Sequence, residues 1–170
     1  LYSRYAVCPH VIYPKNLSQG LEWCTTPMII DGVTIADEGD ARLDINGKVN
    51  TEAILAAKAA GKFSDCRAAR WSAAEIFANG QHGYLPAAGE LQAWIDNINE
   101  IETCLNIIGG VSIKGKYYWS STQTSNAFYA KALNTTNGRL ELTICTKTLD
   151  ESVRPVIALE YSPKNEFSNK

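Results

Sequence analysis

The amino-acid sequence predicts an α+β fold, in which helices come first and an antiparallel sheet comes last. Between Asn50 and Ile108, apolar residues recur three and four positions apart, which is the spacing of an amphipathic helix. After Gly110 the spacing changes to two, which is the alternation of a strand with one buried face. A run of helices followed by a run of strands is typical of α+β domains.

Length and composition fit one globular domain. The chain has 170 residues, of which 45% are hydrophobic and 20% charged, enough to bury a sizeable core. The net charge of -2 offers no excess of basic residues for a phosphate backbone. No apolar run approaches the ~20 residues that cross a bilayer. We therefore expect neither nucleic-acid binding nor membrane insertion.

Residues 1–49 are expected to form an extension of short strands and loops packed on the same domain. The part from Asp31 to Asn50 is acidic and punctuated by glycine, which favours a loop. The oxygen-bearing side chains of the Asp37–Asp44 loop are of the type that Ca²⁺ prefers. The run from Asp44 to Gly47 nevertheless lacks the full Asp-x-Asp-x-Asp-Gly spacing. We prefer a solvated acidic loop to a calcium site and expect no cofactor.

The helical part divides at glycine and proline. Asn50 or Thr51 is suited to cap the first helix, since either side chain can accept hydrogen bonds from free N–H groups of the first turn. Gly109-Gly110 closes the last helical stretch, because glycine adopts the left-handed cap conformation without a Cβ penalty. The predicted helical stretches are about 50–61, about 64–78 and about 88–108.

The strand part is organised around a tight turn. Asn137-Gly138 lies between two alternating segments and is the strongest short signal for a β-hairpin, because a type I′ turn needs positive φ at both central residues. A further strand is expected over Val153–Leu159, with Pro155 at an edge or bulge.

Tyr118 and Trp119 are adjacent, so a strand directs them to opposite faces. We assign Trp119 to the core and expect Ser120–Thr122 to bend the strand.

Five cysteines are present, and no two have the Cys-x-x-Cys spacing of a zinc site. Cys66 and Cys104 lie in helical patterns among apolar neighbours, so we expect free buried thiols. A Cys8–Cys24 disulfide is the alternative.

Several short motifs occur in a fixed order along the chain. They are Asn50-Thr51-Glu52-Ala53-Ile54, Gly83-Tyr84-Leu85-Pro86-Ala87-Ala88-Gly89-Glu90-Leu91, Ile108-Gly109-Gly110, Tyr118-Trp119-Ser120-Ser121-Thr122 and Val153-Arg154-Pro155-Val156. This order resembles the DUF1566-type C-type-lectin-like domains of gut Bacteroidales and their phages. The resemblance implies helices flanking a small twisted antiparallel sheet, with long loops that carry the binding surface. It places a C-type-lectin-like core at 50–160 and a polar tail at 161–170.

Members of this family look like surface adhesins or receptor-binding tail proteins of phages. The sugar-and-calcium triplets Glu-Pro-Asn, Gln-Pro-Asp and Trp-Asn-Asp of calcium-dependent lectins do not occur here. The formylglycine-generating enzymes share the general fold, but the chain has no matching catalytic cysteine pair.

The candidate site is a set of amide, hydroxyl and tyrosine side chains at the ends of the later strands. These groups are the adaptable contact chemistry of binding loops, although asparagine, serine and threonine also favour turns. The candidate ligand-binding residues are Tyr118, Gln123, Thr124, Ser125, Asn126, Tyr129, Asn134, Thr135, Thr136 and Asn137.

Catalytic alternatives are limited by the histidines, His10 and His82. A Cys66–His82 dyad is the only nucleophile–base pair we consider, and a solvated loop histidine is the preferred interpretation of His82. We interpret Arg154 as a structural anchor.

We therefore expect a noncatalytic ligand- or receptor-binding domain rather than an enzyme. It would belong to a phage tail fibre or a bacterial surface protein, on the virion tail or at the cell surface. Its partner would be a host cell-surface glycan or protein, bound through C-terminal loops. A homo-oligomer is expected, and a trimer if the parent is a fibre. The alternatives are a structural decoration or connector domain of a virion, and an enzyme on a fold like that of the formylglycine-generating enzymes.

Overall fold

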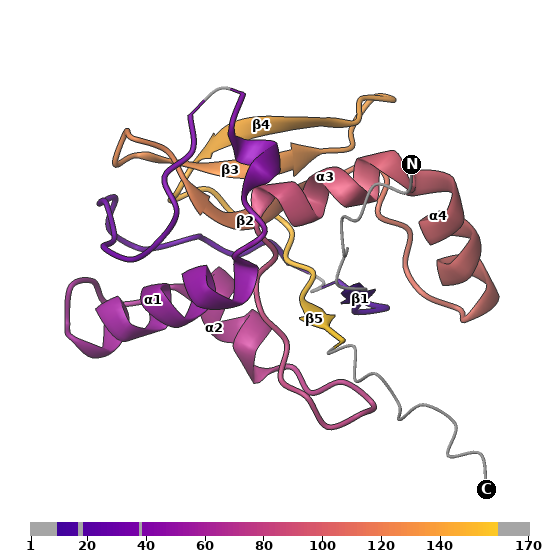
Figure 1. The fold of residues 1–170 in the computed structure, drawn as a ribbon, viewed down its shortest axis with the longest axis horizontal. Coiled ribbons are helices and arrows are strands. Elements are labelled where there is room, and N and C mark those ends of the chain that lie inside the picture. The colour runs from indigo at the N-terminus through magenta and orange to yellow at the C-terminus, as the bar shows by residue number, and fades with distance from the viewer. Residues whose placement is uncertain (1–9, 17–18, 38, 160–170) are drawn as a thin grey trace, which may run out of the picture.

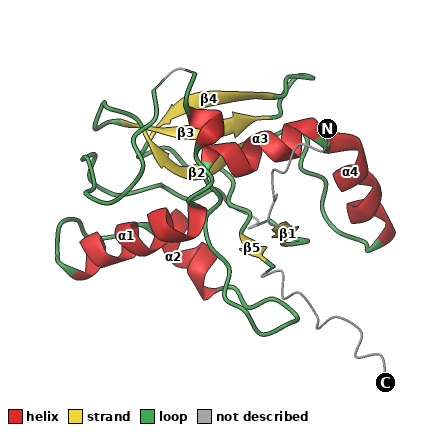
Figure 2. Cartoon of the chain, viewed as in Figure 1, coloured by secondary structure: helices red, strands yellow, loops and turns green. Residues whose placement is uncertain are grey.

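The computed structural model describes residues 10–16, 19–37 and 39–159, and confirms an α+β fold (Figures 1 and 2). The predicted polar tail and Cys8 lie outside these ranges. The helices are η1 (Ala41–Leu43, a 3-10 turn), α1 (Gly47–Ala59), α2 (Arg67–Ala74), α3 (Ala88–Asp96) and α4 (Ile98–Ile107). The strands are β1 (His10–Ile12), β2 (Tyr117–Gln123), β3 (Tyr129–Asn134), β4 (Glu141–Thr146) and β5 (Val156–Ala158).

The predicted antiparallel meander is confirmed. Strands β2, β3 and β4 form a three-stranded sheet in sequence order, and β1 pairs with β5 in a separate two-stranded sheet. The turn between β3 and β4 has φ of 53° at Asn137 and 75° at Gly138. The Arg139 N–H closes it by donating to the Thr136 carbonyl at 2.9 Å. Positive φ at both central residues is the type I′ requirement, which Asn-Gly meets with little strain.

Both faces of the three-stranded sheet pack against a core cluster, and α1 contacts the sheet through β2. On one face, α1 and α2 share a core cluster with Trp119, Ala130 and Ala132. On the other, α3 and α4 share a second cluster with Tyr118 and Leu133. Because β2 lies between the two clusters, Tyr118 and Trp119 are both buried, with 1% and 0% exposure. The prediction for Trp119 is confirmed, and Tyr118 enters a core of its own instead of facing solvent.

A register shift bends β2 as predicted. Trp119 pairs with Ala132 and Gln123 with Ala130, so two extra residues of β2 are accommodated between these pairs. The polar groups of the bulge are satisfied internally: Ser120 Oγ donates to the Lys131 carbonyl at 2.8 Å, and Trp23 Nε1–H donates to the Ser120 carbonyl at 2.8 Å. The Trp-Ser-Ser-Thr motif is therefore a buried structural element.

Helix α1 begins at Gly47, three residues before the predicted cap. Asn50 is fully buried inside the helix. Its Nδ2 donates to Asp44 Oδ2 at 2.9 Å and to Ser121 Oγ at 3.3 Å. Its Oδ1 accepts from the Thr34 N–H at 2.9 Å and from the Thr34 hydroxyl at 3.0 Å. The capping role predicted for Asn50 is wrong, because its partners lie in other segments and not in its own first turn.

The start of α3 explains the motif that precedes it. The Ala87 N–H donates to Glu90 Oε2 at 2.7 Å, and the Ala88 N–H donates to Thr122 Oγ1 at 2.8 Å. The Gly89 N–H donates to the Asp44 carbonyl at 2.8 Å. A Cβ on Gly89 would lie 2.5 Å from that same oxygen, so only glycine allows this approach. The loop before α1 is thereby held against the start of α3.

Helix α2 is shorter than predicted, since it ends at Ala74 instead of near residue 78. Glu75 is extended, with φ of -70° and ψ of 134°. Ile76 then pairs with His82 in an antiparallel bridge. The pattern of apolar residues continues past Ala74, but the backbone bonds of this local turn compete with the helix and end it.

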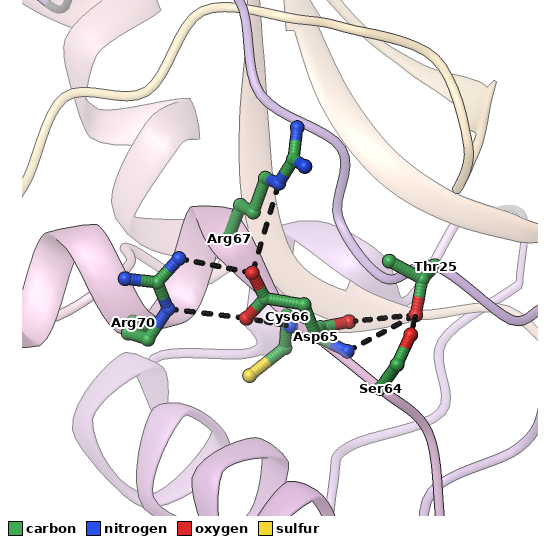
Figure 3. Close-up of polar contacts among 6 residues, drawn as sticks. All are labelled: Thr25, Ser64, Asp65, Cys66, Arg67 and Arg70. Carbon is green, nitrogen blue, oxygen red and sulfur yellow. Dashed lines mark hydrogen bonds and ion pairs between the residues drawn. The ribbon is translucent and has the colours of Figure 1, made fainter.

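A polar cluster fastens the N-terminal segment to the start of α2 (Figure 3). The Thr25 hydroxyl accepts from the Asp65 N–H at 3.1 Å and lies 2.8 Å from Ser64 Oγ. The Asp65 carboxylate accepts from the Cys66 N–H at 2.8 Å and from Arg70 Nε and Nη2 at 3.1 and 2.9 Å. Arg70 is the main reason that the pKa of Asp65 is lowered. The same segment also contributes Trp23 to the first core cluster.

The cysteines whose positions are described are all free thiols. Cys24, Cys66 and Cys145 are buried, but Cys104 is exposed. Cys104 therefore does not follow the expectation of a buried thiol, since its neighbour Leu105 is the α4 residue that enters the core.

The strand predicted at Val153–Leu159 is limited to β5. Arg154, just before it, is 1% exposed and acts as the predicted structural anchor. Its Nε donates to Asn16 Oδ1 and its Nη2 to the Val111 carbonyl.

Candidate ligand-binding site

Half of the candidate binding residues are buried. Gln123 is fully enclosed, and its Nε2 donates to the Ile30 carbonyl at 2.7 Å. The Tyr118 hydroxyl accepts from Asn16 Nδ2 at 3.0 Å. The Thr135 hydroxyl donates to the Ile113 carbonyl at 2.7 Å. Gln123, Tyr118 and Thr135 thus hold loops to the sheet and are set aside from the binding surface. The buried members are Tyr118, Gln123, Thr124, Asn134 and Thr135, none more than 5% exposed.

The candidates also separate into two groups. The turn between β2 and β3 carries Thr124–Asn126, and the turn between β3 and β4 carries Thr135–Asn137. In an antiparallel meander these turns lie at opposite ends of the sheet. The six residues of β3 separate them by roughly 20 Å. The structure therefore does not bring the two groups of candidate residues together.

The β3–β4 turn shows the chemistry of a turn. Asn134 Oδ1 accepts from the Thr136 N–H at 2.9 Å and from the Thr136 hydroxyl at 2.8 Å. The Thr135 hydroxyl donates to the Ile113 carbonyl and so also serves the fold. Asn137 is exposed, and its positive φ accounts for its residue type.

The other end of the sheet is hollowed. A cavity of about 450 Å³ opens over the face of β3 and β4 next to the β2–β3 turn. Three of the candidates, Thr124, Asn126 and Tyr129, line it. Its other lining residues are Asp37, Lys131, Leu142, Thr143 and Ile144. The lining thus combines one aromatic and two aliphatic side chains with five polar or charged ones.

A second hollow of about 410 Å³ adjoins the first. The two share Lys131 and Leu142, and the second is completed by η1 and by α3. Its lining residues are Gly39, Ala41, Arg42, Gln92, Lys131 and Leu142.

Lys131 lies at the junction of the two hollows. It pairs with Ile144 across the sheet and shares its face of β3 with Tyr129 and Leu133. Helix α3 covers the Leu133 end of this face and leaves the Lys131 end open. Lys131 is only 6% exposed. Within the described ranges, its ammonium makes no hydrogen bond and no ion pair within 4.0 Å.

Asp37, from the loop before η1, lines the first hollow together with Lys131. Its Oδ1 accepts from the Ser125 N–H at 3.0 Å. That bond is the main reason that the pKa of Asp37 is lowered, and the positive charge of Lys131 adds to the effect. The segment reaches the site because the Ala36 N–H donates to the Gln123 carbonyl at 2.9 Å, which lays it beside the end of β2. Ser125 and Asn126 are both exposed here.

Sequence reasoning missed Lys131, Arg42 and Gln92. The alternation on β3 contained a signal for Lys131, because a cation at an inward position between Tyr129 and Leu133 breaks an otherwise apolar face. Arg42 and Gln92 come from η1 and α3, and no local pattern connects them to β3.

The Asp37–Asp44 loop, for which calcium is the weaker interpretation, places Asp44 inside the fold. Asp44 is 4% exposed, and its carboxylate accepts from the Asn46 N–H, from Asn50 Nδ2 and from the Thr122 hydroxyl. Its oxygens thus serve the fold. No group of three or more His, Cys, Asp or Glu residues able to hold a metal ion occurs in the ranges 10–16, 19–37 and 39–159.

The groups considered for nucleophilic catalysis lie away from this site. Burial raises the pKa of the Cys66 thiol to about 11, which disfavours the nucleophilic thiolate. His82 is exposed, with Nδ1 2.9 Å from the Ala73 carbonyl. Neither residue lines the two hollows.

Comparison of the chain with protein-family models, with curated proteins and with solved structures finds no match. Among the helices of the described segments, none has the length and apolar character needed to cross a membrane.

Proposed function

We propose that this chain is a noncatalytic binding domain of C-type-lectin-like type that recognises a glycan on a host surface. The observation that carries the proposal is Lys131, a nearly buried cation without a bonding partner in the described structure, at the junction of two hollows. Its ammonium still reaches solvent and has free N–H donors, which the oxygens of a bound ligand would accept.

The lining of the first hollow favours recognition of a hydroxyl-rich molecule. Thr124, Asn126 and Asp37 supply donors and acceptors, and Tyr129 supplies a ring beside them. Asn126 Oδ1 accepts from the Phe128 N–H at 3.0 Å, which fixes the side chain while its amide N–H groups remain available to donate. Such pre-positioned polar groups limit the ordering cost of binding.

The biological setting rests on the family resemblance. An adhesin or a receptor-binding tail protein on the virion or cell surface would present several copies of the domain. Sites of this size are individually weak, and several copies on one particle raise the overall affinity through effective concentration. We therefore include a homo-oligomer in the proposal, trimeric in a fibre.

The test compares cell binding of three proteins, each displayed on multivalent beads. The first is the wild type, the second carries Asn126→Ala and Tyr129→Ala, and the third carries Thr136→Ala and Asn137→Gly at the opposite end of the sheet. Glycine keeps the positive φ of position 137, so the control turn should fold. Gut Bacteroidales cells and mucin-coated surfaces are the targets.

We expect the second protein to lose at least about tenfold in binding while the third binds like the wild type. All three should have melting temperatures within a few degrees of one another. Equal binding by the second protein and the wild type would refute this location of the site. A selective loss by the third protein would place recognition at the β3–β4 turn instead.

A further inference from the structure

We infer that the ligand is an acidic saccharide, whose carboxylate or sulfate lies between Lys131 and Arg42 and whose neutral sugar part occupies the hollow beside Tyr129. This inference rests on the proposed function and adds the charge of the ligand and its direction in the site.

The negative charge of the ligand is inferred from the residues that line the second hollow. Lys131 and Arg42 both line it, and no acidic side chain does. Arg42 is exposed, and like Lys131 it forms no ion pair among the described residues. Gln92 adds an amide that can donate a hydrogen bond; its Nε2 now donates to Asp96 Oδ1 at 3.0 Å on the exposed side of α3. Lys131 and Arg42 therefore give the second hollow a positive lining that suits an anion, while Asp37, whose pKa the charge of Lys131 lowers, lines the first hollow only.

The orientation of the ligand in the site is inferred from the position of Asp37. Its carboxylate lines the first hollow and not the second. The hydrogen bond from Ser125 and the lowered pKa keep this group negatively charged. A ligand anion is therefore repelled from the first hollow and attracted to the second. Asp37 can instead accept a hydrogen bond from a sugar hydroxyl.

The apolar lining completes the fit. Tyr129 and Ile144 lie on the same face of adjacent strands, and Ile144 is 49% exposed. An aromatic ring beside an aliphatic side chain offers a platform for the C–H face of a sugar ring. Each hollow lies within the range of about 300–1,000 Å³ found for ligand pockets. The shared wall at Lys131 and Leu142 allows one ligand to occupy both.

The test uses an array of uronic-acid, sialic-acid and sulfated glycans, each printed beside its neutral counterpart. The proteins are the wild type, Lys131→Met, Lys131→Arg and Lys116→Met. Methionine matches the length of the lysine stem and suits the apolar face of β3. Lys116 is an exposed lysine just before β2, at the opposite end of the sheet, so its variant makes the same change in net charge away from the site.

We expect the wild type to prefer acidic glycans over their neutral counterparts. The Lys131→Met variant should lose about tenfold or more of that binding, as expected for one charge-assisted hydrogen bond. Lys131→Arg should retain most of it, and Lys116→Met should bind like the wild type. Binding to the acidic glycans should weaken with added salt. The melting temperature of Lys131→Met should be equal to or above that of the wild type, because the ammonium makes no hydrogen bond in the fold.

Two results would overturn the inference while leaving the proposed function intact. One is equal binding to acidic and neutral glycans, and the other is unchanged acidic-glycan binding by Lys131→Met, each with cell binding still lost in the Asn126→Ala, Tyr129→Ala protein. If the array shows no glycan binding and that double variant still binds cells, both proposals fail. Cell binding that depends on Lys131 but resists enzymatic removal of glycans would identify a protein ligand and also refute the saccharide.

Discussion

Replacing Asn50 by alanine should destabilise the protein far more than the loss of a helix cap. Asn50 is fully buried and uses both ends of its amide. It connects three segments, namely the loop at Thr34, the loop at Asp44 and the bulge of β2 at Ser121. The alanine variant removes all four hydrogen bonds and leaves groups of these segments without partners.

The magnitude can be worked out from the individual bonds. The two neutral bonds to Thr34 contribute about 1 kcal/mol each, and the bond to the Asp44 carboxylate about 2 kcal/mol. The longer bond to Ser121, at 3.3 Å, adds about 0.5 kcal/mol. Alanine regains about 0.5 kcal/mol through its higher helix propensity. The expected loss is therefore about 4 kcal/mol, whereas the loss of an N-cap costs about 1 kcal/mol.

Urea unfolding followed by far-UV circular dichroism separates these values. With a slope of about 2 kcal/mol/M, the midpoint should fall by about 2 M for an internal connection and by about 0.5 M for a cap. Asn46→Ala is the matched control, because Asn46 precedes α1, is exposed and makes no side-chain cap hydrogen bond. It should change the midpoint by less than about 0.3 M. A loss near 1 kcal/mol for Asn50→Ala would show that the internal connection contributes little.

Two further predictions concern the turn and a buried lysine. Gly138→Val should lower the free energy of unfolding by about 1 kcal/mol or more, since φ is 75° there and no atom lies within 4 Å of an added Cβ, so the cost is that of the backbone alone; chemical denaturation measures it, and an unchanged midpoint would contradict it. Lys147 is fully enclosed, and burial lowers its pKa from 10.5 to about 8. Because the folded-state pKa is the lower one, the penalty on folding is present in full below pH 8 and is relieved as the pH rises towards 10.5. The unfolding free energy of the wild type relative to Lys147→Met should therefore rise by about 2 kcal/mol between pH 7.5 and 10. Both proteins should carry Cys24→Ala, because the Cys24 thiol and Lys147 affect each other's pKa, and a flat difference would show that Lys147 keeps an ordinary pKa.

Features that depend on a few consecutive residues could be predicted from the sequence. Asn137-Gly138 fixed the turn because the need for positive φ is local. The meander followed from the alternation on β3 and β4, and the closing of the helical part followed from Gly109.

Features that depend on distant partners could not be predicted in the same way. Asn50 has the residue type of a cap, but Ser121, one of its partners, lies 71 positions away. Lys131 becomes a candidate for binding only when Asp37, Arg42 and Gln92, which are distant from it in the sequence, are placed around it.

The pairing of β1 with β5 has a mechanical consequence. His10 lies opposite Ala158 and Ile12 opposite Val156, so the outer ends of both strands lie together at one end of this small sheet (Figure 1). A force that pulls on both of these ends would separate the strands as a zipper opens, one hydrogen-bonded pair at a time. A force shared along the strands would instead load all pairs together. Tension between the two ends should therefore open this two-stranded sheet before it disturbs the three-stranded sheet that holds Lys131.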